Sequence, residues 1–235
     1  MREGLSYESD TLSNVTEDVK TRTYDSSRRQ ERTRTTRLRV IRAAHDLFVE
    51  RGYPATSIEA IAAAADVAPA TLYRLFPAKR SLLKAVVDVT AVGDDEPIAL
   101  HDRPELLALR DEPDAKKYLR GFARVARVVG ERAAGIQQML RSAAVVDPEA
   151  ADMLATLNEQ RYAGQGIVAR GVRDRGELKS TLSEARATDV IYGLMSPELR
   201  RILIHERAWT ADQYEHWLAD TLCATLLEER QRAEQ

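Results

Sequence analysis

The sequence predicts an all-α protein, with an N-terminal three-helix domain of the helix-turn-helix type and a C-terminal helical bundle. Two observations predict this class. Apolar residues recur every three or four positions along much of the 235-residue chain, the spacing that places them on one face of a helix. No segment shows the alternation of apolar and polar residues between hairpin turns that half-buried strands have. The periodic segments add up to about nine or ten helices in total.

Composition divides the chain into three parts. Residues 1–30 are polar and lack an apolar period, so we expect a disordered tail there. Residues 31–92 are expected to bind DNA, because the stretch 28–90 holds twelve Lys or Arg and only six Asp or Glu. Residues 93–235 are expected to form a helical regulatory and dimerisation domain with more acidic than basic residues. A basic head on an acidic body is typical of a DNA-binding protein whose body avoids DNA.

The first helix of the basic part is expected from about Thr35 to Arg51. Gly52, directly after it, suits the left-handed position that ends a helix. The arginines at and before its first turns are either solvated or form an arm along the DNA backbone or minor groove. The apolar stripe of this helix consists of Leu38, Ile41, Ala44, Leu47 and Phe48.

Two short helices with a sharp turn between them are expected at about residues 57–76. Thr56 and Glu59 have the spacing of a capping box at the start of the first helix. Asp66 lies at the turn, where Asp tolerates the left-handed conformation better than most residues. Pro69 suits the first turn of the second helix. This layout is typical of a helix-turn-helix, whose second helix enters a DNA major groove.

The second of these helices is expected to have two faces. Leu72 and Phe76 form an apolar face that can pack back onto the first helix. Thr71, Tyr73 and Arg74 point elsewhere, and all three can donate hydrogen bonds. They are therefore candidate contacts to DNA.

A fourth helix is expected from about Ala78. Lys79 and Arg80 in its first turn place positive charge at the positive end of the helix dipole, which is locally unfavourable. A DNA phosphate bound at this helix start would resolve the conflict. The alternative is a solvated surface pair.

The string ATLYRLFPAKRSLL, preceded by ATSIEAIAAAADV, resembles the DNA-binding domain of the TetR (AcrR-like) family of transcriptional regulators. The resemblance runs from Arg37 to about Val92 and rests on the T-L-Y-x-x-F-x-x-K spacing. Two positions depart from the family pattern: Asp66 stands where many members have Gly, and Ala68 stands where many have a capping Ser. The resemblance implies DNA contacts by Arg37, Thr56, Ser57, Pro69, Ala70, Thr71, Tyr73, Arg74 and Lys79.

The acidic part is predicted to be a series of helices. Gly130 is expected to interrupt one of them, and Asp147-Pro148-Glu149 is a strong helix start. Gly164, Gly166 and Gly171 in the following helix would permit close helix approach or local flexibility. A ligand pocket here would use apolar and aromatic residues, although each of them could equally be plain core. The candidates are Phe122, Met139, Leu140, Met153, Leu157 and Tyr192.

The C-terminal end contains two clear helix starts. Ser196-Pro197-Glu198 begins one helix, and Thr210 with Gln213 forms a capping box for the last, which is expected to run to about Arg230. The string SPELRRILIHERAWTADQYEHWLADTL is similar to the ends of many TetR-family members, where the last helices pair across a two-fold axis. We therefore expect a homodimer, with core packing as the alternative role of the large apolar residues here. The candidate interface residues are Trp209, Tyr214, Trp217, Leu218 and Leu222.

These features favour a sequence-specific DNA-binding transcriptional regulator. The leading hypothesis is a dimeric repressor, released from a palindromic double-stranded operator by a small apolar or amphipathic effector. A regulator with no small-molecule effector, or an activator, is the alternative within this class. A helical interaction module and an enzyme are remote alternatives, because the basic head argues against the first and four scattered histidines argue against the second.

Other kinds of site are not expected. A single cysteine, Cys223, excludes an internal disulfide and a cysteine-ligated zinc site. The chain has no Gly-rich phosphate loop and no catalytic constellation, so we expect no cofactor, metal or catalytic residue. No apolar run approaches the length of a membrane span, so no membrane partner is expected. The composition fits a cytoplasmic protein.

Overall fold

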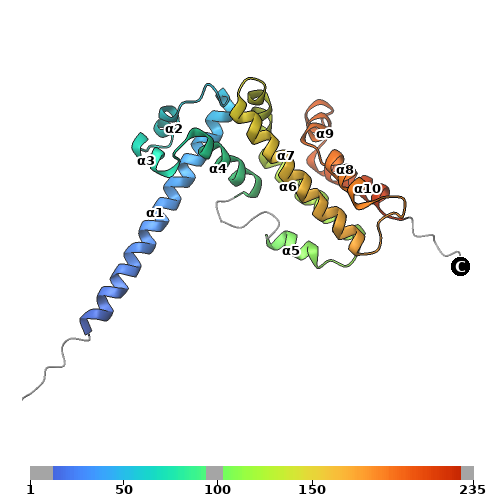
Figure 1. Ribbon diagram of the computed structural model, residues 1–235, viewed down its shortest axis with the longest axis horizontal. Coiled ribbons are helices and arrows are strands. Elements are labelled where there is room, and N and C mark those ends of the chain that lie inside the picture. The colour runs from blue at the N-terminus through green and yellow to red at the C-terminus, as the bar shows by residue number, and fades with distance from the viewer. Residues whose placement is uncertain (1–12, 94–102, 229–235) are drawn as a thin grey trace, which may run out of the picture.

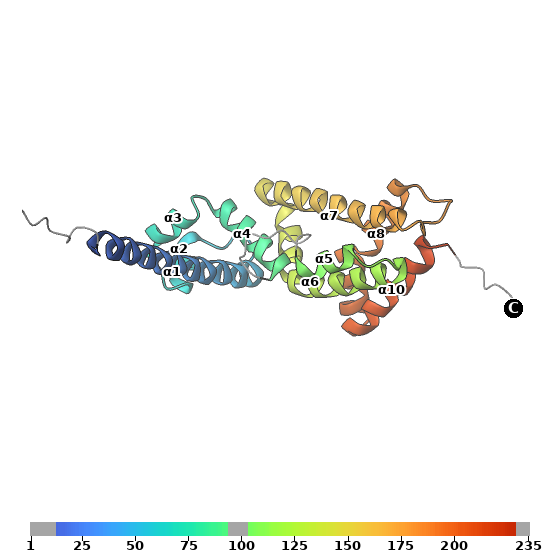
Figure 2. The same ribbon diagram turned by 90° about the horizontal axis from the view of Figure 1, so that it is seen from below.

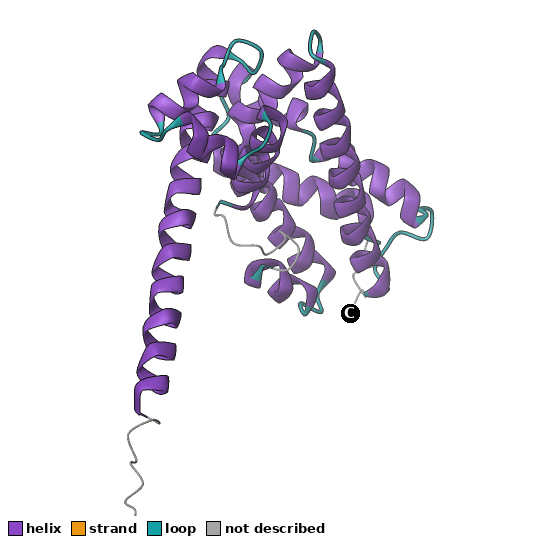
Figure 3. Ribbon diagram, turned by 60° about the vertical axis from the view of Figure 1, so that its left-hand side comes forward, coloured by secondary structure: helices purple, strands orange, loops and turns teal. Residues whose placement is uncertain are grey.

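The computed structural model describes residues 13–93 and 103–228. In these ranges the chain forms helices and one isolated bridge, between Leu178 and Leu227 (Figure 3). The all-α class predicted from the sequence is therefore confirmed. The helices are α1 (Ser13–Arg51), α2 (Ile58–Ala64), α3 (Pro69–Leu75), α4 (Lys79–Val92), α5 (Pro104–Arg110), α6 (Ala115–Ala144), α7 (Pro148–Asp174), α8 (Glu184–Leu194), α9 (Pro197–Arg201), a π-helical turn (Ile202–Glu206) and α10 (Ala211–Leu226).

The molecule is elongated, with α1 to α4 at one end and α6 to α10 at the other (Figures 1 and 2). We call these two groups the head and the body. In the body, the long helices α6 and α7 pack on each other, α8 packs on α7, and α10 packs on α6. The head joins the body through contacts of α4 and α1 with α6. None of the helices in the described ranges combines the length and the apolar composition needed to cross a membrane.

Head and body share one hydrophobic core. Its head part comprises buried residues of α1 to α4, among them Phe48, Ile61 and Leu72. Its body part comes from the end of α6 and the start of α7, and includes Met139 and Met153. A second core lies within the body and joins α6, α7, α8 and α10. Because the first core is close-packed across the boundary, a shift of α6 or α7 would move the surfaces on which α1 and α4 rest.

Helix α1 begins much earlier than the sequence predicted. It starts at Ser13, whereas we expected a start near Thr35 and a disordered tail over residues 1–30. The tail prediction is therefore wrong for residues 13–30, and residues 1–12 lie outside the described ranges. Polar composition was a poor guide here, because this stretch contains neither Gly nor Pro to interrupt a helical backbone.

Two further element boundaries differ from the prediction. Gly130 does not interrupt a helix, because α6 continues through it. The last helix ends at Leu226 instead of continuing to about Arg230, a residue outside the described ranges. At this end the chain becomes extended, and the backbone amide of Lys179 donates to the Leu226 carbonyl at 2.8 Å. This contact ties the end of α10 to the segment that precedes α8.

Several local predictions are confirmed. Asp66 (φ 51°) and Gly52 (φ 83°) adopt the left-handed backbone conformation expected at their turns. Asp147 caps α7, and its carboxylate accepts a hydrogen bond from a backbone amide of the first turn at 3.0 Å. Thr210 and Gln213 form the predicted capping box of α10. These features depend on neighbouring residues alone, which is why the sequence predicts them.

Candidate nucleic-acid interface

The turn that leads into α2 differs from the prediction. Ser57, not Thr56, caps the helix, and its Oγ accepts a hydrogen bond from the Ala60 amide at 3.1 Å. The Thr56 hydroxyl lies 2.8 Å from the carbonyl oxygen of Gly52 and 3.1 Å from that of Leu47. Thr56 is only 2% exposed, so it fastens the turn to the end of α1. The predicted capping box and the predicted DNA contact of the Thr56 side chain are therefore wrong.

Helix α3 is held against the head by its inner face. Leu72 is fully buried, and Phe76 at the end of the helix is 3% exposed. The turn before α3 is closed by a hydrogen bond from the Val67 amide to the Ala62 carbonyl at 3.0 Å. Ala68 offers no side chain to cap the helix, as the sequence predicted. These contacts fix the orientation of α3 from one side and leave its other side free.

The outer face of α3 carries most of the predicted DNA contacts. Tyr73 is 47% exposed, and Arg74 is exposed beside it. Pro69 and Ala70 in the first turn are also exposed, and Thr71 is half-buried. α3 lies at the outer edge of the head, next to α1 (Figure 1). An exposed helix with polar side chains on its outer face is what a major groove can admit.

Two other predicted contacts flank α3. Arg37 on α1 lies over the ring of Phe76, with its guanidinium carbon 4.7 Å from the ring centre. Its Nη1 is buried and has no hydrogen-bond partner. The ring therefore holds a guanidinium beside the end of α3. Ser57 is exposed, although its hydroxyl already serves as the cap of α2.

Lys79 makes contacts within the protein. Its Nζ donates to the Tyr53 carbonyl at 2.5 Å and lies 4.3 Å from the centre of the Tyr53 ring. Burial lowers the pKa of Lys79, while the charges of Asp147 and Glu149 oppose that shift. A phosphate contact would require this half-buried ammonium to turn outward. The contact predicted for Lys79 stays a prediction.

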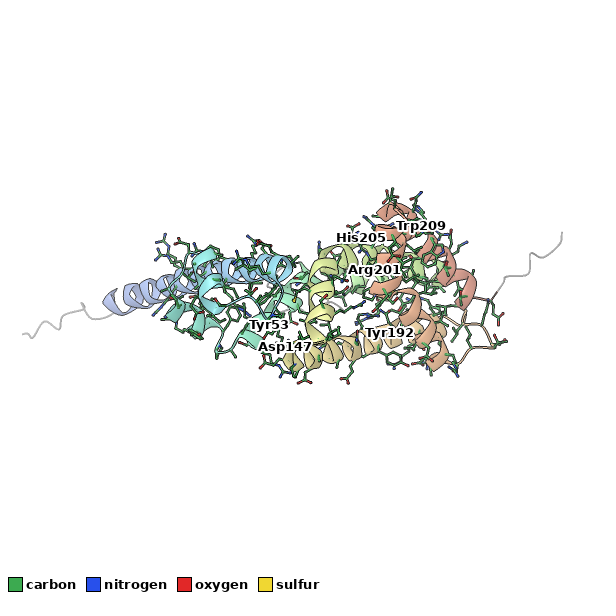
Figure 4. The ribbon with its side chains drawn as sticks, turned by 90° about the horizontal axis from the view of Figure 1, so that it is seen from above. Tyr53, Asp147, Tyr192, Arg201, His205 and Trp209 are labelled. Atoms are coloured by element: carbon green, nitrogen blue, oxygen red, sulfur yellow. The ribbon has the colours of Figure 1, made fainter. Side chains whose placement is uncertain are left out.

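Tyr53 forms a link between head and body that the sequence did not predict. Its hydroxyl donates to Oε2 of Glu149, in the first turn of α7, at 3.1 Å. Burial and the negative Glu149 carboxylate raise the pKa of Tyr53. A second pair, Arg80 and Asp152, lies 3.7 Å apart along the same boundary. Figure 4 shows Tyr53 and Asp147 together where the head meets α7. Sequence reasoning treated Asp147-Pro148-Glu149 only as a helix start, because no local signal indicates a partner 96 residues away.

A groove lies beside this link. It has a volume of about 380 Å³ and is lined by head residues that include Val49 and Pro54, and by α6 residues that include Gly135 and Met139. At Gly135 an added Cβ would lie 3.3 Å from a methyl carbon of Val49. A side chain at this position would require Val49 to move by a few tenths of an ångström, so α1 and α6 approach each other closely here.

Four of the predicted pocket residues lie where head and body share their core. Leu140 is fully buried, and Met153 is 7% exposed. Leu157 packs on the same core from α7. Met139 is also part of that core and lines the groove between head and body. These four residues fill space between helices.

The other two predicted pocket residues lie deeper in the body. Phe122 packs on Tyr118, with ring centres 4.9 Å apart. Tyr192 packs on Tyr162, with ring centres 5.5 Å apart. The six residues therefore divide between two places in the body, and the pocket that they are predicted to line stays a prediction. Core packing, the alternative that the sequence left open, accounts for most of them.

The candidate dimer residues divide into two groups. Tyr214, Leu218 and Leu222 are at most 1% exposed and belong to the body core, so the prediction that they form an interface is wrong. Helix α6 covers this face of α10 within the same chain. Trp209 and Trp217 are half-buried, with ring centres 5.9 Å apart. They line a shallow hollow of about 530 Å³ together with Asp212, Gln213 and His216.

Comparisons with known proteins agree with this architecture. Residues 40–86 match the family model described as "Bacterial regulatory proteins, tetR family". The chain is 26% identical over 185 residues to the HTH-type transcriptional regulator YdeS of Bacillus subtilis, an alignment that covers 76% of this chain and 84% of YdeS.

Two solved structures show the same fold. NalD of Pseudomonas aeruginosa, the secondary repressor of the MexAB-OprM multidrug efflux pump, is 20% identical with a TM-score of 0.61, over 85% of this chain and 99% of NalD. SmeT in its complex with triclosan is 17% identical with a TM-score of 0.62, over 83% of this chain and 93% of SmeT. The matched family model covers α2, α3 and most of α4, the elements that position the exposed face described above. Residues 40–86 thus match the DNA-binding region of the TetR family, and the comparisons indicate a DNA-binding transcriptional regulator and not an enzyme.

Proposed function

We propose that this regulator is a dimeric repressor that binds a palindromic operator through α3 and leaves it when a small molecule binds to the body. Residues 31–92 would form the DNA-binding domain, and residues 93–235 the regulatory and dimerisation domain. The observation that carries the proposal is the outer face of α3, where Tyr73 and Arg74 are exposed on a helix whose inner face is firmly packed. The protein would act in the cytoplasm, where a bacterial operator is accessible.

The DNA contacts divide by chemistry. Arg74 can donate two parallel hydrogen bonds to a guanine or bind a phosphate, and the Tyr73 hydroxyl can donate or accept. Thr71, Pro69 and Ala70 would lie against the groove wall. Arg37 would reach the backbone, because its guanidinium is held on Phe76 beside the end of α3. Lys79 would add a phosphate contact after release from the Tyr53 carbonyl.

A dimer interface on this chain would use Trp209 and Trp217. Trp217 on α10 and Trp209, two residues before its start, are both half-buried and meet edge to face, whereas Leu218 and Leu222 of the same helix are fully buried in the body core. Exposed aromatic residues are enriched at the centres of protein interfaces. A second copy would place a second α3 on the other half-site of the operator, which strengthens binding because the second contact becomes intramolecular.

Binding of an effector would release the repressor from its operator through the hydrophobic core that head and body share. A molecule that moves α6 or α7 changes the packing around Met139 and Met153, and through it the positions of α1 and α4. The link from Tyr53 to Glu149 connects the same elements by a hydrogen bond. An effector would weaken DNA binding to the extent that it prefers the shifted arrangement. The similarity to NalD, a repressor, and to SmeT, which binds triclosan, supports both parts of the proposal.

The test begins with an operator selected from random duplex DNA by the full-length protein. In fluorescence-anisotropy titrations, Arg74→Ala should weaken binding by about 1–3 kcal/mol while the fold is unchanged. Arg186→Ala is the matched control, because that arginine lies on α8 with its side chain 78% exposed. Equal affinity of Arg74→Ala and the wild type would contradict the placement of α3. If sedimentation showed that one protein chain binds each operator, the proposed dimer would be contradicted. If a reporter gene lost expression when the regulator was deleted, the protein would be an activator.

A further inference from the structure

Three arginines and one carboxylate of the body lie on or beside α9. Arg141 on α6 forms an ion pair with Glu198 at the start of α9. The charges of both residues affect the pKa of Arg161 on α7, which Glu198 raises and Arg141 lowers. Arg200 follows Glu198 on α9. The cluster therefore has two more positive than negative charges.

Arg200 is buried without a partner for its Nε. The residue is 8% exposed, and its Nε has no hydrogen-bond acceptor. The side chain lies against α6 at Gly130, where an added Cβ would be 2.8 Å from both Cδ and Nε of the arginine. A glycine at this position thus makes room for the guanidinium inside the body.

Arg161 faces the same region with a second unpartnered nitrogen. Its Nη2 is buried and has no hydrogen-bond acceptor, whereas other parts of the guanidinium contact Asn158, at 3.4 Å from Nη1, and the Tyr192 hydroxyl. The guanidinium carbon lies 4.4 Å from the centre of the Tyr192 ring, on α8. Burial raises the pKa of Tyr214 on α10 to about 12, and the positive charges of Arg200 and Arg161 both oppose this shift. The two arginines therefore approach one tyrosine from different helices.

An unpartnered buried guanidinium N–H is costly, because the group has lost water and gained no acceptor. The planar fork of arginine matches the oxygens of a carboxylate or a phosphate. We infer that Arg161 and Arg200 bind the oxyanion group of a small organic effector, a carboxylate or a phosphate monoester. The regulatory part of this inference rests on the proposed function, whereas the binding site does not.

The segment that follows Arg200 connects the proposed oxyanion site with the surface of the body. A π-helical turn, Ile202–Glu206, follows directly, and Ala208 then adopts a left-handed backbone with φ 57°. Both are uncommon conformations of the kind found near functional sites. Trp209, two residues before the start of α10, comes next. Figure 4 shows Arg201, His205 and Trp209 along this segment, and Tyr192 at a distance from the head–body link marked by Tyr53.

The experiment uses full-length protein without DNA and three probes of similar shape: benzoate, phenyl phosphate and neutral benzamide. Thermal unfolding and calorimetry are recorded at constant ionic strength for the wild type, Arg200→Met and Arg161→Met. Arg186→Met is the control, because it removes an exposed guanidinium from the same body. At least one of the two oxyanions should raise the Tm of the wild type and of the control, and benzamide should not. The comparison of benzoate with phenyl phosphate identifies the preferred group.

In Arg200→Met the oxyanion should bind about tenfold more weakly or worse. The ligand-free variant should also melt at a higher temperature than the wild type, because an uncompensated buried charge has been removed. An arginine with a structural role would show the opposite change in Tm. If Arg200→Met does not fold, the comparison is made with Arg161→Met, which should lose the oxyanion in the same way.

Three results would overturn the site: no shift of the wild-type Tm with either oxyanion, an equal shift with benzamide, or an unchanged shift in both arginine variants. The regulatory role is tested separately, by adding the oxyanion to the operator complex. Binding without release of DNA would leave the site standing and overturn its role as an effector site. Failure of the protein to bind any selected operator would instead overturn the proposed function, whatever the oxyanion does.

Discussion

The link between Tyr53 and Glu149 allows a sharp test of how the head is held on the body. Tyr53→Phe removes one hydroxyl and leaves the ring in place against Phe48, whose centre lies 5.3 Å away, and under the ammonium of Lys79. The lost interaction is a 3.1 Å hydrogen bond to a carboxylate. Hydrogen bonds to charged groups contribute about 1.5–3 kcal/mol to stability. Because Glu149 is an exposed residue and water competes for its oxygens, we expect about 1 kcal/mol for this pair.

The measurement is a double-mutant cycle of Tyr53→Phe and Glu149→Ala, read from urea unfolding of the full-length protein. The cycle is needed because Glu149 also lies in the first turn of α7, where the helix dipole stabilises a carboxylate. That contribution is lost equally with and without the tyrosine hydroxyl, so it cancels in the coupling energy.

Tyr162→Phe serves as the control for the cycle. Its hydroxyl donates to Asp189 at 3.0 Å, but the tyrosine is 43% exposed and both helices belong to the body. We expect a change of about 0.5 kcal/mol or less for this surface pair. A coupling energy of zero between Tyr53 and Glu149, or a loss no larger than that of Tyr162→Phe, would refute the idea that this hydrogen bond holds the head on α7.

Two further predictions concern packing and pH. Gly171→Ala should destabilise the protein by about 1–3 kcal/mol, because the new Cβ would lie 2.0 Å from the Tyr118 hydroxyl oxygen. Gly164→Ala on the same helix should stabilise the protein by about 0.5–1 kcal/mol, since nothing lies within 4 Å of the added Cβ. Equal changes of Tm in the two variants would contradict this prediction. Unfolding at increasing pH should show stability falling above about pH 10, the pKa of an unfolded tyrosine, because the raised pKa values of Tyr53 and Tyr214 keep their protons on in the folded state. The decrease should be smaller in Tyr53→Phe, and an identical pH profile would show that the hydroxyl is not perturbed.

The sequence predicted most of the features that depend on neighbouring residues. Asp66, Pro69 and Asp147 have the conformations or positions expected, because a turn, a first helical residue or a cap is decided within a few residues. Where two neighbours offer the same chemistry, the local signal is not enough. Thr56 and Ser57 both carry a hydroxyl that could cap α2. Carbonyl oxygens at the end of α1 accept hydrogen bonds from the Thr56 hydroxyl, so Ser57 caps the helix.

The features that depend on distant partners were not predictable from one chain. Leu218 belongs to the apolar stripe of α10. Such a stripe predicts that the residues are buried, but it does not identify the surface that covers them, which here is α6 of the same chain. The same limit applied to Arg200, which a helical pattern assigns to the solvent side. Its burial becomes visible only when Gly130, 70 positions earlier, is seen to leave the space that its guanidinium occupies. In this body the sequence therefore predicted where apolar side chains are buried, and the structure was needed to show which charged ones are buried with them.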